Sequence, residues 1–296
     1  MKYQVFWSLI AIWFMPLAVW AGEDSTLKLG LGMKYFAEQS QEMSFNDAVE
    51  RFKAEDVEVG KSEVLSFGYT ASTFWFHEKI PAGAVAKASV LILEYALIDY
   101  VECYLVQGEN ITRFRVGDEY VFRERPIAYP EFVFPLEIIE NQAADIYLRI
   151  RTSSSFQIPL TLMPESKFKT LLADRSVLMG MYFGIVLIMV LYNFFIFTST
   201  RERLFLLYVM YGVGWGLLQA TTRGYSYQYL WPESPDWNGV AIVVVGSFAG
   251  VGMFGFSREF LGIPRQLPRI DLVFKTAIGA FATMMVAAFV LPYSLM

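Results

Sequence analysis

Hydrophobic residues are concentrated in the second half of the chain, in long runs separated by short polar segments. The first run, residues 177–197, contains no charged residue, and as a helix it would extend about 30 Å, the thickness of a bilayer's hydrocarbon core. Similar runs follow at residues 204–220, 240–256 and 272–291. The pattern therefore predicts an all-α, multi-span transmembrane domain over residues 177–296, with four spans.

The first half of the chain has the pattern of a β domain. Residues 22–60 are polar and mixed, and Ser44 is placed to cap one short amphipathic helix. After residue 64, seven stretches rich in β-branched and aromatic residues alternate with turn sequences. The expected strands are 72–80, 89–95, 100–106, 111–116, 129–137, 144–152 and 155–163. Seven strands with no long helix between them predict an all-β sandwich or jelly roll over residues 22–163.

Two shorter segments flank this β domain. Residues 1–21 combine Lys2, an apolar core and the sequence Val19-Trp20-Ala21 before Gly22, a pattern typical of a secretory signal peptide. We expect it to export the β domain, with an uncleaved anchor as the alternative. Residues 164–176 form a connector that is not rich in Gly or Ser, so a movement of the sandwich would reach the first span.

The basic residues predict the orientation in the membrane. The first and third connections between spans carry most of the Lys and Arg, whereas the second carries only Arg223. Since short cytoplasmic loops are enriched in Lys and Arg, the sandwich and the second connection are expected outside, in the periplasm. Four spans would then bring residue 296 to the outer side, and we expect the chain to be part of a longer protein.

Composition excludes several classes of function. The net charge of −5 argues against a nucleic-acid partner. One histidine and one cysteine are too few for a multi-histidine metal site or an internal disulfide. The chain contains no Gly-rich phosphate loop and no nucleophile elbow. We therefore expect no catalytic residue, metal or cofactor in these residues.

The β domain does contain candidate ligand-binding side chains. Aromatic rings such as Trp75, Tyr95 and Tyr104 suit a carbohydrate-like ligand, although packing within the sandwich is the alternative.

Pairs of arginines two positions apart point to an acidic ligand. Arg123 and Arg125 form one such pair, and Arg149 and Arg151 form another. In a strand, both members of a pair share a face and repel each other unless carboxylates or an anionic ligand lie between them. A solvated outer face neutralised by nearby glutamates is the alternative.

Small residues in the spans predict close helix contacts. Gly180 and Gly184 lie on one helix face, as do Gly246 and Gly250. These pairs indicate packing within the bundle, with a homodimer as the alternative. No ionisable residue lies in the middle of a span, which disfavours a transporter.

Several long stretches resemble one bacterial family. They are STFWF (72–76), LEYALIDYVECYLV (93–106), RPIAYPEFVFPLEI (125–138), ADIYLRIRTSSSFQIPLTLMPESKF (144–168) and MGMYFGIVLIMVLYNFFIFTSTRERLFLLYVMY (179–211). In order and spacing they resemble the seven-transmembrane receptors with diverse intracellular signalling modules, over roughly residues 35–296.

The resemblance implies a signal receptor of the bacterial inner membrane. It implies a jelly-roll domain similar to carbohydrate-binding modules, seven spans of which four are present, and a cytoplasmic output module such as a diguanylate cyclase or histidine kinase, which these residues do not contain. The expected partners are the lipid bilayer and a small-molecule or carbohydrate-like ligand. An accessory membrane protein that only binds or anchors a partner, or a transporter subunit, remains the alternative.

Overall fold

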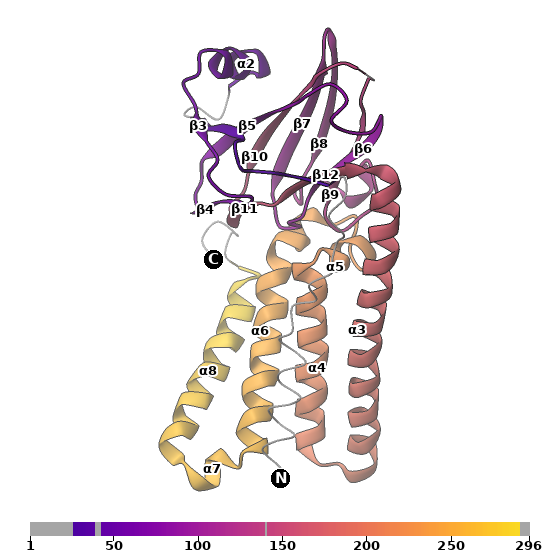
Figure 1. The fold of residues 1–296 in the computed structure, drawn as a ribbon. Helices are drawn as coiled ribbons and strands as arrows, with labels where there is room; N and C mark the ends of the chain where they lie inside the picture. The colour runs from indigo at the N-terminus through magenta and orange to yellow at the C-terminus, as the bar shows by residue number, and fades with distance from the viewer. Residues whose placement is uncertain (1–25, 39–42, 140, 291–296) are drawn as a thin grey trace.

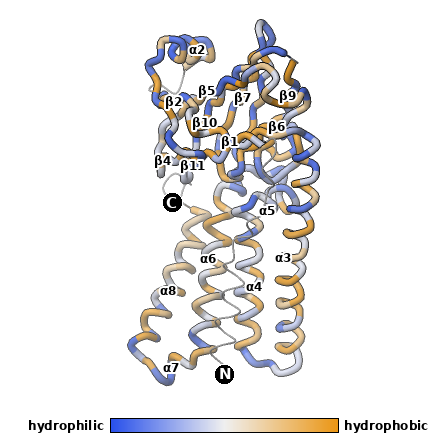
Figure 2. Tube along the Cα trace, in the orientation of Figure 1, coloured by the Kyte–Doolittle hydropathy of each residue, from blue (hydrophilic) through white to orange (hydrophobic). Residues whose placement is uncertain are grey.

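The computed structural model describes residues 26–38, 43–139 and 141–290, so the expected signal peptide at residues 1–21 lies outside the described residues. A β-sandwich stands on one end of a bundle of long helices (Figure 1). Hydrophobic residues dominate these helices, whereas the sandwich alternates hydrophobic and hydrophilic positions (Figure 2). The fold is therefore the expected all-β domain followed by an all-α membrane domain.

The sandwich is built from two main antiparallel sheets. The larger has the order β3 (Glu58–Val59), β2 (Lys34–Glu38), β5 (Thr73–Ile80), β10 (Ala144–Arg151), β7 (Tyr100–Gln107) and β8 (Asn110–Val116). The smaller has the order β1 (Leu27–Leu29), β12 (Leu160–Pro164), β6 (Ala88–Leu93) and β9 (Phe132–Glu137). A further pair joins β4 (Leu65–Tyr69) to β11 (Ser155–Ile158).

The core lies between the two main sheets and follows the alternation in the sequence. Leu148 on β10 and Cys103 on β7 are cross-strand neighbours and are fully buried there, together with Phe134 of the smaller sheet. Alternate residues of β10, such as Arg149, lie on the outer face. Cys103 is thus a small hydrophobic core residue.

Two strand predictions need correction. The expected strand at residues 155–163 is two strands in different sheets, because Pro159 lacks an N–H and the chain changes sheets there. The expected strand at 129–137 begins only at Phe132. Strands β1 to β3, in the region interpreted as mainly polar, and β4, which follows that region, were not predicted.

Among the described residues, the helical half contains four helices long and apolar enough to cross a membrane. They are α3 (Glu165–Thr200), α4 (Arg203–Thr222), α6 (Pro235–Phe260) and α8 (Pro268–Ala287). Short helices α5 (Tyr225–Tyr229) and α7 (Ile263–Gln266) lie in the connections, α5 beside the sandwich and α7 at the opposite end (Figure 1).

The connector at residues 164–176 is not a separate segment. Helix α3 begins at Glu165, directly after β12, and runs without a break for 36 residues, or about 54 Å. Its first turns are amphipathic: Phe168 packs with Tyr129 and Val133 on the outer side of the smaller sheet. One rigid element therefore leads from a sandwich strand through the first span.

Glycine positions show where the spans approach each other. A Cβ added at Gly214 on α4 would lie 2.7 Å from the Ala249 Cα on α6. Gly250 meets the ring of Phe281 on α8 in the same way, at 2.8 Å. The other glycines expected at helix contacts behave differently: Gly246 would reach only a Leu218 methyl at 3.7 Å, and Gly180 and Gly184 would reach no atom within 4 Å.

Candidate functional site

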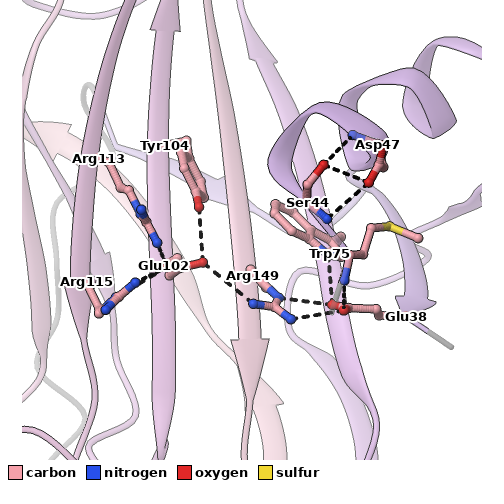
Figure 3. Close-up of polar contacts among 10 residues, drawn as sticks. Glu38, Ser44, Asp47, Trp75, Glu102, Tyr104, Arg113, Arg115 and Arg149 are labelled. Atoms are coloured by element: carbon pink, nitrogen blue, oxygen red, sulfur yellow. Dashed lines mark hydrogen bonds and ion pairs between the residues drawn. The ribbon is translucent and has the colours of Figure 1, made fainter. Parts of the chain in front are cut away.

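The outer face of the larger sheet carries four of the seven candidate residues, Trp75, Tyr104, Arg149 and Arg151, and two of them lie in one cross-strand row. Trp75 on β5 is paired with Arg149 on β10, which is paired with Glu102 on β7, which is paired with Arg115 on β8. Since cross-strand partners share a face, these four side chains lie next to one another on the side of the sheet away from the core. Figure 3 shows them together with Glu38 and Tyr104.

Glu38, at the end of β2, is the buried anchor of this row. Its side chain is fully buried and accepts hydrogen bonds from the Trp75 Nε1 at 3.0 Å and from the Arg149 Nε and Nη2 at 3.0 and 2.9 Å. It also accepts a 2.7 Å bond from the backbone N–H of Met43, just before helix α2 (Phe45–Lys53). One carboxylate thus joins three strands to the start of a helix.

Glu102 neutralises the arginines of β8. It is 3% exposed and forms ion pairs with Arg113 and, at 3.2 Å, with Arg115, while the Tyr104 hydroxyl donates to it at 3.1 Å. Burial alone would raise the pKa of this carboxyl, but hydrogen bonds from Tyr100 and Arg113 outweigh burial and hold the pKa below its usual range. The surrounding arginines and tyrosines therefore favour the ionised form of Glu102.

Helix α2 covers one end of the outer face. A Ser44–Asp47 capping box begins the helix, and the Phe45 ring stacks on the Tyr104 ring at 4.3 Å. Trp75 is only 1% exposed and Tyr104 only 7%, so neither ring has an open face for a sugar. Both rings pack against α2, so the prediction that they bind a carbohydrate-like ligand needs correction. Tyr95 packs against the core between the sheets.

The uncovered end of the outer face is basic. We call it the basic patch: Tyr100, Arg113, Arg115, Tyr120 and Arg151. The three arginine side chains are 48%, 49% and 41% exposed. The guanidiniums of Arg115 and Arg151 lie 6.0 and 5.6 Å from the centre of the Tyr100 ring, within the range of cation–π attraction.

Arg123 and Arg125 do not belong to this face. They lie in the short 3₁₀ helix η1 (Phe122–Glu124) and just after it, where the sandwich meets the membrane helices. The exposed Arg123 pairs with Glu233 at 2.6 Å. The buried Arg125 donates to the carbonyls of Tyr129 and Pro130 at 3.0 and 2.8 Å.

Helix α5 docks onto the same loop of the sandwich. The Tyr227 hydroxyl donates to the Tyr120 carbonyl, and the ring of Tyr227 meets the ring of Phe122 edge to face. The Phe122 N–H donates to the Pro232 carbonyl at 2.9 Å. Gly224, with φ +78°, begins α5, and an added Cβ would lie 2.6 Å from the Pro130 carbonyl oxygen, which leaves no room for a larger residue. We call this contact the α5 junction.

A second contact ties α3 to the sandwich. Arg175 pairs with Glu94 at 2.7 Å and with Glu131 at 3.0 Å. Burial raises the pKa of the Glu131 carboxyl to about 7, although Arg175 opposes the shift. A carboxyl that titrates near neutrality therefore contacts Arg175, which lies two residues before the first apolar run at Val177.

The basic patch and the α5 junction are connected by two successive residues. Glu119 pairs with Arg151 of the patch at 2.9 Å, and the carbonyl of Tyr120 receives the Tyr227 hydroxyl. Glu119 and Tyr120 thus link the basic patch to the backbone that holds α5.

Comparison with known protein families agrees with this division of the chain. Residues 30–164 match the family described as 7TMR-DISM extracellular 2, and residues 175–296 match the family described as 7TM diverse intracellular signalling. The chain belongs to the 7TMR-DISM receptors. A search of curated proteins found no match.

In this 7TMR-DISM chain, sequence reasoning missed the residues that organise the site. Glu38 lies in a strand that was not predicted. Tyr227 lies in the segment 221–239, which contains five tyrosine and tryptophan residues and was interpreted only as the second connection between spans. The density of tyrosine and tryptophan in that loop was the available signal. Such residues have an apolar ring and a polar tip, which suits a junction between a sandwich and a membrane surface.

Proposed function

We propose that this receptor binds an acidic small ligand, such as a carbohydrate that carries carboxylates, at the basic patch in the periplasm. The patch offers half-exposed guanidiniums beside an aromatic ring, and guanidinium binds carboxylate through two parallel hydrogen bonds. A sugar ring would lie on Tyr100 or Tyr120.

The relay follows from the contact between the patch and the α5 junction, and this contact is the observation that carries the proposal. A ligand carboxylate competes with Glu119 for Arg151 and shifts residues 119–122. Tyr227 and Phe122 pass this shift to α5, which connects spans α4 and α6. Signalling requires that the ligand bind the two arrangements with different affinity.

The output belongs to a cytoplasmic module outside these 296 residues, of the diguanylate cyclase or histidine kinase class. The α3–α4 turn and α7 lie at the end of the bundle opposite the sandwich (Figure 1). They and the first residues of α4 and α8 carry Arg201, Arg203, Arg265 and Arg269. This charge supports placing that end in the cytoplasm, with the sandwich across the inner membrane.

The test is a binding titration on the full chain in lipid nanodiscs, with digalacturonic acid as the probe and neutral digalactose as its uncharged counterpart. We expect the acidic disaccharide to bind at least tenfold more tightly than the neutral one. Arg115→Gln and Arg151→Gln should abolish this preference. Arg51→Gln removes the same charge from α2, outside the patch, and should leave it unchanged. Equal binding of both sugars would refute an acidic ligand class.

Hydrogen exchange separates a receptor from an accessory anchoring protein. Saturating digalacturonic acid should change the exchange of backbone amides in residues 119–131 and 225–233 of wild type. In Tyr227→Phe, the change should persist in the first segment and shrink in the second. Binding without any change in residues 225–233 would contradict the relay and favour the accessory protein.

A further inference from the structure

An apolar groove opens between the upper part of α3, α4 and α5. It has a volume of about 360 Å³, and its walls include Met179, Gly180, Phe183 and Tyr225. Tyr229 and Leu230 lie at its rim, 71% and 57% exposed. The groove lies in the first two turns of the apolar run that begins at Val177, so it is placed in the outer half of the membrane.

The groove exists because α3 stands away from α4 at this end. Further down, α3 reaches α4: a Cβ added at Gly216 would lie 3.1 Å from a methyl of Val186. Nearer the sandwich, a Cβ added at Gly180 would reach no atom within 4 Å. Tyr225 of α5 approaches Phe183, with ring centres 6.0 Å apart, and forms the upper wall.

A polar cavity of about 230 Å³ continues the groove toward the sandwich. The two spaces share Met179 and Tyr225, and the polar one is lined by Arg175, Arg223 and Glu131 among others. From Arg175 to Phe183, α3 rises about 12 Å, so the lining changes from charged to apolar over roughly the length of a lipid headgroup and the start of its tails.

The charges of the polar cavity are unevenly paired. Arg175 is held by both Glu94 and Glu131. Arg223, at the end of α4, is exposed, and its guanidinium forms no ion pair with any residue in the described part of the chain. Its charge acts on the Glu131 carboxyl only at longer range, so one cation at the mouth of the cavity has no carboxylate in contact with it.

We propose that the groove and the polar cavity together bind one phospholipid of the outer leaflet, with its phosphate on Arg223 and an acyl chain against Gly180 and Phe183. The order of charged and apolar lining along α3 matches the order of headgroup and tail, and Arg223 complements the phosphate. The lipid fills the space between α3 and α4, so its presence sets the separation of the two spans.

The test is native mass spectrometry of the full chain, purified in detergent and incubated with phosphatidylglycerol. We expect wild type to retain one phosphatidylglycerol, and Arg223→Gln to retain it at least fivefold less. Arg203→Gln, at the opposite end of α4, serves as the charge control and should behave as wild type.

Two glycine variants test the apolar part of the site. Gly180→Leu fills the groove, whereas Gly184→Leu adds the same side chain one turn lower on α3, also into open space but outside the groove. We expect Gly180→Leu to lose phosphatidylglycerol at least fivefold and Gly184→Leu to retain it.

Several results would overturn the proposal. They are a wild type that retains no phospholipid, an Arg223→Gln variant that retains as much as wild type, and equal retention by the two leucine variants. A Gly180→Leu variant that loses a dimer while keeping its lipid would show that the groove binds a second copy of the chain instead. Binding of inorganic phosphate that depends on Arg223 but is unchanged in Gly180→Leu, without lipid retention, would show a phosphate site with no tail.

Discussion

Replacement of Glu38 by Gln tests whether burial decides the strength of an ion pair in the sandwich. The change keeps the shape of the side chain but removes its charge and one of its two acceptor oxygens. In the native protein those oxygens accept from Arg149, from the Trp75 indole and from the Met43 amide. The Gln amide group would point its own N–H toward at least one of these donors.

The expected loss follows from the burial of the pair. Breaking a buried ion pair by removing one partner costs about 3–5 kcal/mol. Arg149 keeps a second carboxylate, Glu102, at 3.9 Å, and its side chain is 17% exposed, which reduces the cost. We therefore expect Glu38→Gln to lower the free energy of unfolding by about 2–3 kcal/mol.

Glu119→Gln is the matched control. Glu119 also pairs with an arginine, Arg151, and the N–O distance is again 2.9 Å, but the Glu119 side chain is 51% exposed. Exposed pairs contribute about 0–1 kcal/mol, so this variant should be close to wild type. The two pairs have the same N–O distance, but Glu38 is buried and also accepts from Trp75 and Met43, whereas Glu119 is half-exposed and accepts only from Arg151 among the described residues.

Thermal unfolding of the full chain in detergent measures both variants. A loss of 2–3 kcal/mol corresponds to about 5–10 °C in the Tm of a sandwich of this size, and the control should shift by less than about 3 °C. Equal shifts would refute the argument that burial decides. A double-mutant cycle with Arg149→Gln should show coupling above about 1 kcal/mol, and no coupling would mean that Glu38 acts only through Trp75 and α2.

Three further predictions concern the junctions and the bundle. Burial raises the pKa of Glu131 from 4.5 to about 7, so the stability that this carboxyl contributes is complete below about pH 4.5 and is lost as pH rises through 7. The Tm of wild type should therefore fall relative to that of Glu131→Gln between pH 5 and 7.5. Parallel curves of Tm against pH for the two proteins would contradict the pKa shift. Gly214→Leu forces a side chain against the Ala249 backbone and should lower the free energy of unfolding in detergent by about 1–3 kcal/mol. Gly239→Ala, with nothing within 4 Å of the new Cβ, should be neutral or slightly stabilising. A neutral Gly214→Leu would disprove the close contact. Tyr227→Phe removes one hydrogen bond to the sandwich and should cost about 0.5–1.5 kcal/mol while hydrogen exchange in α5 rises, and unchanged exchange would mean that the bond does not hold α5.

Much of this fold could be predicted because two periodicities are strong in the sequence. Along β10, Leu148 and Ile150 face the core while Arg149 and Arg151 face outward, as the alternation indicates. The spans were identified because a bilayer requires about 20 apolar residues in succession, a requirement that leaves a clear pattern.

The missed strands have a physical explanation. Strands β1 and β3 contain only three and two residues, too short for any alternation to show. On β2, Phe36 and Glu38 are both buried on the outer face, because α2 covers that face. From the sequence alone, Glu38 would be expected to be exposed. It is buried because α2 packs on it, and this tertiary contact cannot be inferred from the local sequence pattern.

The site was only partly predictable for a related reason. The rule that paired arginines share a face holds for Arg149 and Arg151 but fails for Arg123 and Arg125, because the latter two lie in and after a 3₁₀ helix and not in a strand. Arg125 donates to two carbonyls, which any residue can provide, so its partners leave no signal in the sequence.

The packing of the spans indicates which of them moves when the sandwich moves. Helices α4 and α6 meet backbone to backbone at Gly214, a contact that resists sliding because interiors packed at this density deform little. Helix α3 meets α4 through side chains such as Val186, while Gly180 and Gly184 meet nothing within 4 Å. It is also the span that continues directly from a sandwich strand. If the sandwich tilts on the α5 junction, we therefore expect α3 to move against the α4–α6 pair, and we expect the displacement to reach the α3–α4 turn at the end opposite the sandwich.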